Sequence, residues 1–457
     1  MTPPTPPGTS EPGPDSEPPG PESERPAPTA AGATAGQVLR NPRIWIIPSV
    51  LVTAVSLLLA LLYMGGILNP RIDLHRVPVG LVSADKGATV DGKQQNLGAS
   101  ITAAVAAAPD PDDRVNWQVL TPAEAQQKLA SNQLYGALEI PEDFTAAVAG
   151  LGQPPAGSPA RPIAVVLTNP GSGSLASSFA SSIATDAAHR ASLDLGKQLT
   201  AIAAQRATQQ GTQVSNASAL LLADPITVET RVGHPIGPHS GLGLSAFYYT
   251  LLLVLAGFLG GNAIGNGVDV ALGYTDNELG PWHTRRRTVP ITRRRTWVVK
   301  SVMSTVISLF TSAVIMLATV GILGMDASHL PLLFLFSFCA SAAVGLGVQA
   351  INATFGGIGQ LVSMFVFIVL ALPSSGATIP LQALPDFYRF LARFEPMRQL
   401  SDGIRAILYF DARADAGLAR AWIMIAVGTV LALLLGWVMT SYYDRKGLRR
   451  LVAVDSA

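Results

Sequence analysis

The chain contains little charge and a single cysteine. Only 13% of its 457 residues are Asp, Glu, Lys or Arg, and 49% are hydrophobic. A soluble protein is typically about 25% charged. Cys339 has no second cysteine with which to form an internal disulfide, and it lies in an apolar run. The shortage of charge therefore points to a membrane protein before any motif is considered.

The sequence also lacks the motifs of several enzyme classes. It has no Gly-x-x-x-x-Gly-Lys-[Ser/Thr] phosphate loop, no Gly-x-Ser-x-Gly nucleophile elbow and no His/Cys/Asp/Glu spacing typical of a metal site. Its apolar runs carry no Asp, Glu, Arg or His at mid-depth, which argues against an exporter driven by a proton gradient alone. We therefore expect a protein that is not an enzyme and that holds neither a cofactor nor a metal.

The first half of the chain predicts a tail, a membrane span and a soluble domain. Residues 1–36 are rich in Pro, Gly, Ser and acidic residues, which predicts a disordered cytoplasmic tail. Residues 44–67 are uncharged, and about 20 apolar residues cross a bilayer. Residues 71–241 are polar, and strand patterns alternate with helical ones, which predicts an extracytoplasmic α/β domain. Its expected strands are 77–85, 115–120, 135–140, 161–169 and 225–232, and its expected helices begin at Thr121 (a capping box with Glu124), Pro141 and Ser174.

The rest of the chain predicts five further spans. The uncharged run after residue 330 is too long for one span, so we expect it to divide at Gly356 and Gly357. An outer hairpin of two amphipathic helices, residues 384–410, and a cytoplasmic tail, residues 443–457, complete the layout. The predicted fold is a polytopic α-helical membrane protein with six transmembrane helices, whose α/β domain lies between helices 1 and 2. The spans after the first are 242–268, 301–324, 331–352, 357–373 and 421–442.

Six arginines lie within eleven residues of the predicted loop 269–300. Cytoplasmic loops are enriched in Lys and Arg, and this loop and the basic C-terminal tail fall on the same predicted side. The cluster therefore predicts that both termini are cytoplasmic, in the plasma membrane of a bacterium, and that it attracts anionic lipids of the bilayer. A nucleic-acid site is excluded, since no aromatic residues are interleaved with the arginines. The predicted topology determinants are Arg285, Arg286, Arg287, Arg293, Arg294 and Arg295.

Small and polar residues recur within the spans. Gly257, Gly261 and Gly265 are spaced four apart, which predicts close helix packing, either within the chain or in a homodimer. Five amides fall near the cytoplasmic ends of their spans and predict hydrogen bonds between helices or a polar inner vestibule: Asn262, Asn266, Gln349, Asn352 and Gln360. The outer hairpin carries an apolar stripe that predicts a helix lying in the membrane interface or a lid of packed helices: Phe387, Phe390, Leu391 and Phe394.

The layout and three local motifs resemble a known family. The segments 77–87 (VPVGLVSADKG), 134–144 (LYGALEIPEDF) and 277–300 (NELG…TVPITRRRTWVVK) are similar to segments of the type-two permeases of ABC transporters, in the branch that includes the phage infection protein family. The resemblance covers about residues 40–450. It implies that the cytoplasmic segment contains a coupling helix for a separate ATPase subunit, with Glu278, Pro290, Arg293 and Lys300 matching the pattern. The first Arg triplet and GPWH depart from that pattern.

The sequence leaves two function classes open. The first is a permease-like subunit that exports an amphiphilic, lipid-like or drug-like molecule, with the ATPase supplied in trans. The second is a membrane scaffold or receptor that does not transport and that serves a secretion or envelope machine or a phage. A neighbouring ATPase gene would favour the first, and a partner held by the external domain alone would favour the second.

Overall fold

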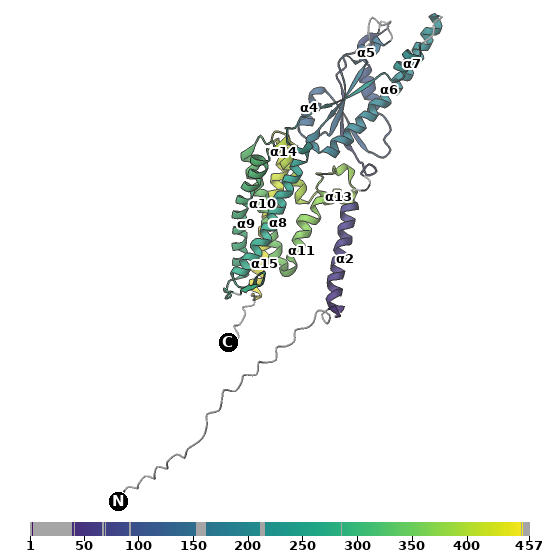
Figure 1. Cartoon of the computed structure of the whole chain (residues 1–457). Coiled ribbons are helices and arrows are strands. Elements are labelled where there is room, and N and C mark those ends of the chain that lie inside the picture. The colour runs from purple at the N-terminus through teal and green to yellow at the C-terminus, as the bar shows by residue number, and fades with distance from the viewer. Residues whose placement is uncertain are drawn as a thin grey trace. The chain divides into compact units, whose positions relative to one another are not determined.

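The computed structural model in Figure 1 describes residues 39–40, 42–65, 68, 70–90, 93–151, 161–210, 215–284, 286–448 and 450, together with residue 2. The chain divides into two units, Met1–Leu58 and Leu59–Ala457. The first unit holds most of helix α2 (Pro42–Gly65), where the first span was predicted. The predicted tail, residues 1–36, lies outside the described residues apart from residue 2.

The second unit begins with an α/β domain built on a five-stranded sheet. Neighbouring strands are parallel, except that β5 and β6 run antiparallel. The strand order is β4 (Val115–Leu120), β1 (Val77–Ser83), β5 (Gly136–Ile140), β6 (Ile163–Thr168) and β7 (Thr227–Val232). Each lies within two residues of a predicted strand, because buried β-branched runs bounded by polar turns are a strong local signal.

Helices cover both faces of this sheet. Successive strand residues point to opposite faces. Residues such as Val79, Leu138 and Val166 pack with α3 (Leu97–Ala106), α5 (Phe144–Gly150) and α6 (Ser174–Gln210). On the other face, Ala137, Val165 and Leu167 pack against Leu129 of α4 (Pro122–Ala130). Figure 1 shows α4 and α6 on opposite sides of the strands.

Local signals explain which helices of the domain were predicted. The capping box at α4 is present, since Thr121 N donates to Glu124 Oε2 over 2.9 Å and Glu124 N donates to Thr121 Oγ1 over 3.3 Å. The prediction missed α3, α7 (Asn216–Ala223) and the hairpin of β2 (Ala88–Val90) and β3 (Lys93–Gln95). Helix α3 is rich in small and β-branched residues, so its helical periodicity is weak; its N-cap Asn96 accepts from Ala99 N over 2.7 Å.

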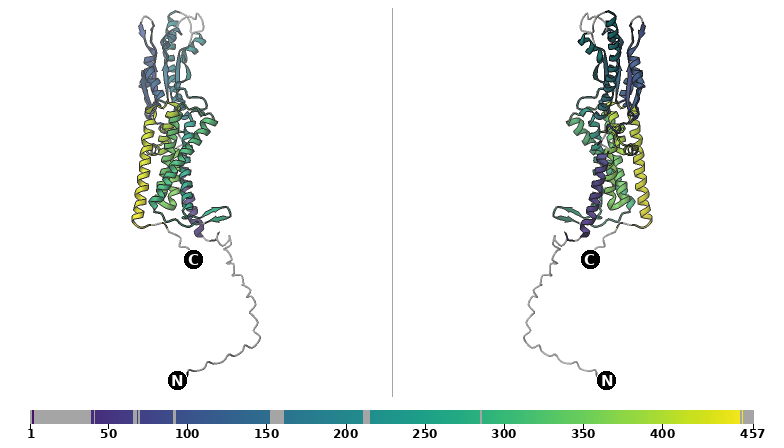
Figure 2. Two further views of the ribbon diagram at one scale, coloured as in Figure 1. Left: turned by 90° about the vertical axis from the view of Figure 1, so that its left-hand side faces the viewer. Right: turned by 90° about the vertical axis from the view of Figure 1, so that its right-hand side faces the viewer.

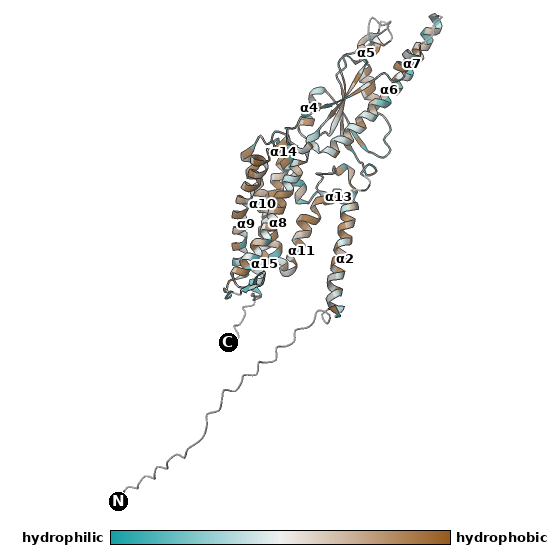
Figure 3. Cartoon of the chain, in the orientation of Figure 1, coloured by the Kyte–Doolittle hydropathy of each residue, from teal (hydrophilic) through white to brown (hydrophobic). Residues whose placement is uncertain are grey.

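The C-terminal half is a bundle of long apolar helices. Four helical stretches in the described part of the chain are long and apolar enough to cross a membrane: Ser245–Ala271, Arg293–Ile322, Leu330–Ser374 and Leu418–Arg445. They comprise α8 (Ser245–Ala271), α9 (Arg293–Met316) with the π-helix Leu317–Ile322, α10 (Leu330–Phe355) and α15 (Leu418–Arg445). Figure 3 shows these helices coloured mainly as hydrophobic. The chain is thus a helical membrane protein with a sheet-containing domain.

The longest of these stretches changes direction where the sequence predicted a break. Helix α10 ends at Phe355, and Gly356 takes φ 60° and ψ −126°, a conformation open to glycine. Helix α11 (Gly359–Met364), the π-helix Phe365–Val369 and α12 (Ala371–Ser374) follow. The apolar run is therefore two helical segments joined at the glycine pair.

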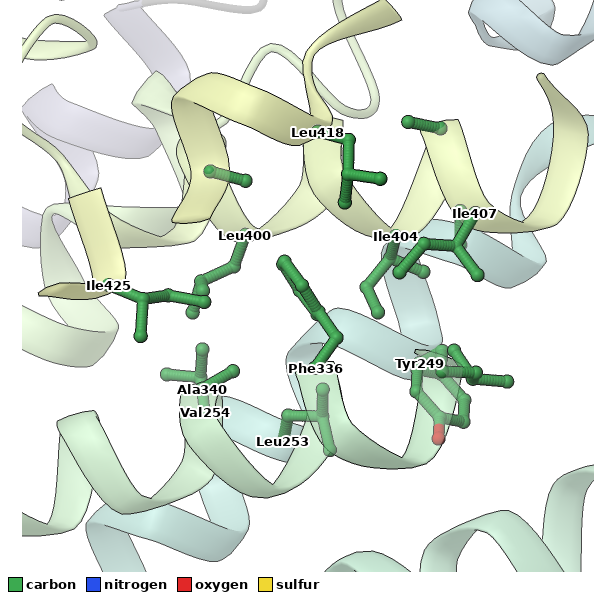
Figure 4. Packing of buried hydrophobic residues seen from close by; sticks show 14 of the residues in the cluster. Tyr249, Leu253, Val254, Phe336, Ala340, Leu400, Ile404, Ile407, Leu418 and Ile425 are labelled. Atoms are coloured by element: carbon green, nitrogen blue, oxygen red, sulfur yellow. The ribbon is translucent and has the colours of Figure 1, made fainter. Parts of the chain in front are cut away.

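The bundle core contains the second helix of the predicted outer hairpin. Helix α14 (Pro396–Tyr409) buries Leu400, Ile404 and Ile407 against α8, α10 and α15, as Figure 4 shows around Phe336. Of the two readings of 384–410, interfacial helices or a lid of packed helices, the burial of this second helix fits the packed one. Protein side chains, and not lipid, cover the apolar face of α14. The periodicity of apolar residues is the same for a helix covered by protein and for one covered by lipid.

The predicted basic loop 269–300 is shorter than expected. Helix α8 extends to Ala271, and α9 begins at Arg293 with Thr292 as its N-cap. Between them, β8 (Asn277–Leu279) and β9 (Trp282–Thr284) form a hairpin, visible beside the helix ends in Figure 2. No helix lies between α8 and α9 in the described residues, and residues 293–300 of the predicted loop form the first turns of α9.

Candidate functional site: a polar cavity at the basic end of the helices

A cavity of about 300 Å³ opens among α8, α9, α10 and α15 at the end that carries the arginines, called here the basic end. Its lining is polar, although the helices that form it are apolar. Polar groups within a membrane bundle are costly unless they are partnered or face water, so they mark functional positions. Among the lining residues are all five amides singled out in the sequence: Asn262, Asn266, Gln349, Asn352 and Gln360.

Glycines bring the two amide-bearing helices together. A Cβ on Gly257 would lie 2.7 Å from Ser341 O of α10, and one on Gly261 would lie 2.9 Å from Val348 Cγ1. At this close approach, Gln349 Nε2 donates to Gly261 O over 2.7 Å. Gly265 continues the stripe, and a Cβ on it would lie 3.8 Å from Gln349 Oε1. The glycine stripe thus packs within this chain, which is the first of the two readings of the sequence.

Two of these amides are hydrogen-bonded to each other, and one amide oxygen is left without a partner among the described residues. Asn352 Nδ2 donates to Asn262 Oδ1 over 3.0 Å, and Asn262 Nδ2 donates to Phe258 O over 3.0 Å. The Oδ1 of Asn352 is buried and has no hydrogen-bond partner among the described residues. An unpaired buried acceptor is unfavourable. The cavity therefore offers an acceptor for a donor group or water that enters it.

A carboxylate holds two cations at the wall of the cavity. Lys300 Nζ lies 2.8 Å from Asp269 Oδ1, and Arg450 Nη2 donates to Asp269 Oδ2 over 3.1 Å. The three side chains are only 13%, 19% and 23% exposed for Lys300, Asp269 and Arg450. The Arg450 guanidinium also lies 4.7 Å from the centre of the Tyr274 ring. We call these three residues the ionic clamp; it joins the C-terminal segment to α8 and α9.

The remaining arginines of α9 fasten it to the end of α15. Backbone N–H groups of Arg293 and Arg294 each donate to Asp444 over 3.0 Å, so a carboxylate from α15 caps the start of α9. Arg293 Nε donates to Leu448 O over 2.6 Å. The guanidinium of Arg294 lies 4.9 Å from the Trp437 ring centre. These contacts give the second arginine triplet a structural role besides any effect on topology.

The residues matched to the coupling pattern are not all brought together. Arg293 and Lys300 line the cavity, whereas Glu278 is exposed on β8 and Pro290 is exposed before α9. Arg286 and Arg287 are also exposed, and their carbonyl oxygens pack on Gly273, which takes φ 75°. Arg285 lies outside the described residues, and Arg295 donates its backbone N–H to Thr292 Oγ1 over 3.3 Å.

The predicted interfacial stripe is found on α13 (Asp386–Leu391) and the turn after it. Phe387, Phe390 and Phe394 are 57%, 59% and 64% exposed, and Leu391 is half-buried. The opposite face holds Tyr388, which donates its hydroxyl to Leu62 O over 3.0 Å. An exposed phenylalanine stripe backed by a buried face suits a helix at a membrane interface.

Sequence reasoning missed the acidic partners of the basic cluster. Asp269 lies in the predicted basic loop, and Asp444 and Arg450 lie in the predicted C-terminal tail, but no pairing between the two segments was predicted. No local sequence pattern connects Asp269 with Arg450, which lies 181 positions further along the chain. The available signal was the position of each charge at the end of an apolar run, where the end of a neighbouring helix can pair with it.

The chemical groups of the cavity lining are those that bind polar solutes. Its lining supplies amide donors and acceptors, a carboxylate and two cations. No group of three His, Cys, Asp or Glu residues that could hold a metal occurs in the described part of the chain. Such a lining suits the polar or charged part of a solute and the water around it.

Fold and cavity together define a helical membrane protein with an inserted α/β domain and a polar pocket at its basic end. The family described as "Protein of unknown function (DUF3533)" matches residues 49–428, and the chain belongs to this family. It is also similar to the "Uncharacterized protein YhgE" of Bacillus subtilis (strain 168), at 22% identity over 223 residues, which is 49% of this chain and 26% of that protein. The chain thus matches about a quarter of the relative's length. No solved structure matches the chain.

The similarity to YhgE supports a YhgE-like relationship for about half of the chain. The similarity does not extend to the type-two permeases of ABC transporters as a superfamily. It also identifies no substrate.

Proposed function

We propose that the chain is a permease-like subunit of an exporter that moves an amphiphilic, lipid-like or drug-like molecule out of the cell, with an ATPase supplied in trans. The observation that carries the proposal is the polar cavity at the basic end of otherwise apolar helices. Its free acceptor on Asn352 and its two cations suit the polar end of an amphiphile.

In this proposal the chain crosses a bacterial plasma membrane six times and keeps both termini in the cytoplasm. Helix α2 would be the first span, and the stretch Leu330–Ser374 would provide two, because 45 residues of helix are about twice what one crossing needs. The basic end then faces the cytoplasm, as the positive-inside rule requires. The α/β domain lies outside the cell.

The proposed ATPase would dock on the exposed surface of the basic end. Glu278 and Pro290 are exposed there, so they are accessible to a partner. Arg293 and Lys300, in contrast, support the α9–α15 junction and the ionic clamp. A substitution at Glu278 therefore probes docking without disturbing the cavity.

The test is mild crosslinking in the native membrane, purification of the full chain and identification of what accompanies it. We expect a stoichiometric ATPase that is lost in Glu278→Ala. The matched control is Glu142→Ala, which removes an exposed carboxylate of the α/β domain paired only with Lys86. An ATPase lost equally in both variants, or absent from the wild-type sample, overturns the docking proposal.

A second candidate is a membrane scaffold or receptor for a secretion machine, the envelope or a phage. It is favoured by the helical pair α6–α7, where Leu220 is 76%, Ile202 46% and Leu221 40% exposed. Exposed apolar side chains on a projecting helix are typical of a partner-binding surface. A partner retained through residues 71–241, with no ATPase present, would support the scaffold and reject export.

A further inference from the structure

A second cavity, of about 310 Å³, lies on the side of the helical bundle and is apolar. Its floor is formed by buried residues, among them Ala340, Leu400 and Ile425, which face one another in Figure 4. Its rim on α15 is exposed: Val427, Leu431 and Leu435 are 44%, 60% and 39% accessible. We call this cavity the lateral groove. It opens sideways from helices long enough to cross a membrane.

Small residues create the lateral groove. Ala343, Gly347 and Ala350 of α10 line one wall, and Gly428 and Ala432 of α15 line the other. The π-helix Phe365–Val369 places Phe367 against Gly347, where a Cβ would clash with the ring, and so closes the groove on that side. At Gly428 a Cβ would meet no atom within 4 Å. Space for an occupant therefore remains beside Gly428.

The length of the groove matches one leaflet of a bilayer. Its lining on α15 runs from Met424 to Leu435, which at about 1.5 Å per residue is about 16 Å. The hydrocarbon core of a bilayer is about 30 Å thick, so one leaflet contributes about 15 Å. A single extended acyl chain lying along α15 would fill this length.

An unpaired acceptor lies at the end of the groove near α14. Gln399 is 1% exposed and lines the groove. Its Nε2 donates to Ala392 O over 3.2 Å, but its Oε1 has no partner among the described residues. A buried amide oxygen without a donor is unfavourable. A hydroxyl or ammonium group at the head of an occupant would supply that donor.

We propose that the lateral groove binds one acyl chain of a membrane phospholipid, with the donor group of its head directed to Gln399. The acyl chain runs from Gln399 towards the basic end, because Leu435 lies two residues before Trp437, whose ring contacts Arg294. The proposal rests on the membrane embedding in the proposed function but not on export, and it names phospholipid as the class of amphiphile that the bundle holds.

The test is photolabelling of the full chain in vesicles of phosphatidylethanolamine and phosphatidylglycerol. Two phosphatidylethanolamine probes carry a diazirine, one near the acyl carbonyl and one at the acyl end. We expect the first to label residues around Phe394 and Gln399 and the second to label residues around Leu435 and Ile351. In both cases an excess of unlabelled phosphatidylethanolamine suppresses labelling, because the site saturates.

Substitutions at Gly428 provide the decisive comparison. Gly428→Leu fills the groove, and we expect labelling there to fall about tenfold, equivalent to about 1.4 kcal/mol. Gly428→Ala should give an intermediate loss. The matched control is Gly260→Leu, the same change at a helical glycine that also has no atom within 4 Å and that lies outside the groove. Labelling that is equal in wild type and Gly428→Leu overturns the proposal.

A variant of Gln399 tests the head group. In wild type we expect unlabelled phosphatidylethanolamine to compete better than phosphatidylcholine, because the head of phosphatidylcholine has no N–H donor. In Gln399→Leu this preference should vanish, while the probe at the acyl end still labels the groove. Labelling that does not saturate, or that is as dense on the exposed α9 residues Val302, Val306 and Phe310 as in the groove, would mean ordinary lipid contact only and would reject the site. Because no ATPase or export assay is involved, failure of the proposed function leaves this result unaffected.

Discussion

The two ends of the helical bundle are held together by different forces. At the basic end, charged groups join α8, α9 and α15 around a cavity. The side chains of the ionic clamp there are 13–23% exposed. At the opposite end, α14 is wedged between α8, α10 and α15 by buried apolar side chains, with Phe336 and Ile404 both 0% exposed. Ionic contacts beside water can be exchanged for contacts with a ligand or partner, whereas a close-packed apolar wedge cannot move without leaving voids.

The α14 end also joins the bundle to the α/β domain. His234 contacts Tyr409 O over 2.8 Å and stacks on Phe410, and the hydroxyl of Tyr135 donates to Gln382 Oε1 over 2.9 Å. The buried Arg405 donates to Ala377 O over 2.7 Å. The contrast therefore separates a rigid end, which carries the α/β domain, from a breakable end, which carries the polar cavity. Four substitutions test this contrast.

The largest effect is expected from overfilling the wedge with Gly403→Leu. A Cβ at Gly403 would already lie 2.7 Å from the Cβ of Ala421 and would clash with the ring of Phe336. Overpacking a filled core costs about 3 kcal/mol, so the midpoint of SDS-induced unfolding in mixed micelles should fall sharply. Gly260→Leu, where space is open, should unfold like wild type. Equal midpoints for the two variants would mean that the α14 end is not close-packed.

The next effect is expected at the ionic clamp, from Asp269→Ala. Lys300 and Arg450 would lose their shared carboxylate, and we expect about 2 kcal/mol of destabilisation, below the range for fully buried pairs because water reaches the clamp. The C-terminal segment should also detach, so trypsin should cleave at Arg445 and Lys446 faster than in wild type. Asp194→Ala, which removes an exposed partner of Lys197, is the control and should change neither readout. Unchanged cleavage in Asp269→Ala would contradict the clamp.

These contacts also show what the sequence could and could not predict. Hydropathy located the bundle helices, and period-two runs located the strands, because both signals are local. The five amides were predicted to gather since all fall at one end of their apolar runs, and Asn262 and Asn352 do meet. The sequence could not decide between an interfacial and a packed position for α14, because Leu400, Ile404 and Ile407 form the same stripe whether lipid or protein covers it. The pairing of Asp269 with Arg450 requires the tertiary fold.

A smaller effect at the rigid end concerns the pH dependence of stability. Glu395 caps α14, and its side chain accepts from Met397 N over 2.9 Å and Arg398 N over 2.8 Å. Burial raises the pKa of Glu395 from 4.5 to about 8, although those two N–H groups and the charge of Arg398 oppose the rise. Between these pH values the folded state keeps a proton that the unfolded state has released. Stability is therefore greatest below pH 4.5 and falls as pH rises towards 8.

Glu395→Gln should remove this slope, which unfolding midpoints measured from pH 5 to pH 8 would report. The matched control is Glu124→Gln. The backbone N–H and hydroxyl of Thr121 lower the pKa of Glu124, so this group is already ionised in both states across that interval. Wild-type and Glu395→Gln curves that run parallel would show that Glu395 is ionised in the folded protein and that the α14 end tolerates a buried charge.

The smallest effect is expected from Tyr409→Phe, at the contact between α14 and the start of α8. The Tyr409 hydroxyl pairs with Ser245 Oγ over 2.7 Å, accepts from Ala246 N over 3.0 Å and lies 3.3 Å from Ser240 O. Its removal leaves the N–H of Ala246 unpaired in an apolar core, which costs about 1 kcal/mol. Tyr248→Phe, at a ring that is 58% exposed, should cost nothing measurable. If both variants unfold like wild type, apolar packing alone holds the rigid end, and the contrast with the ionic end becomes sharper.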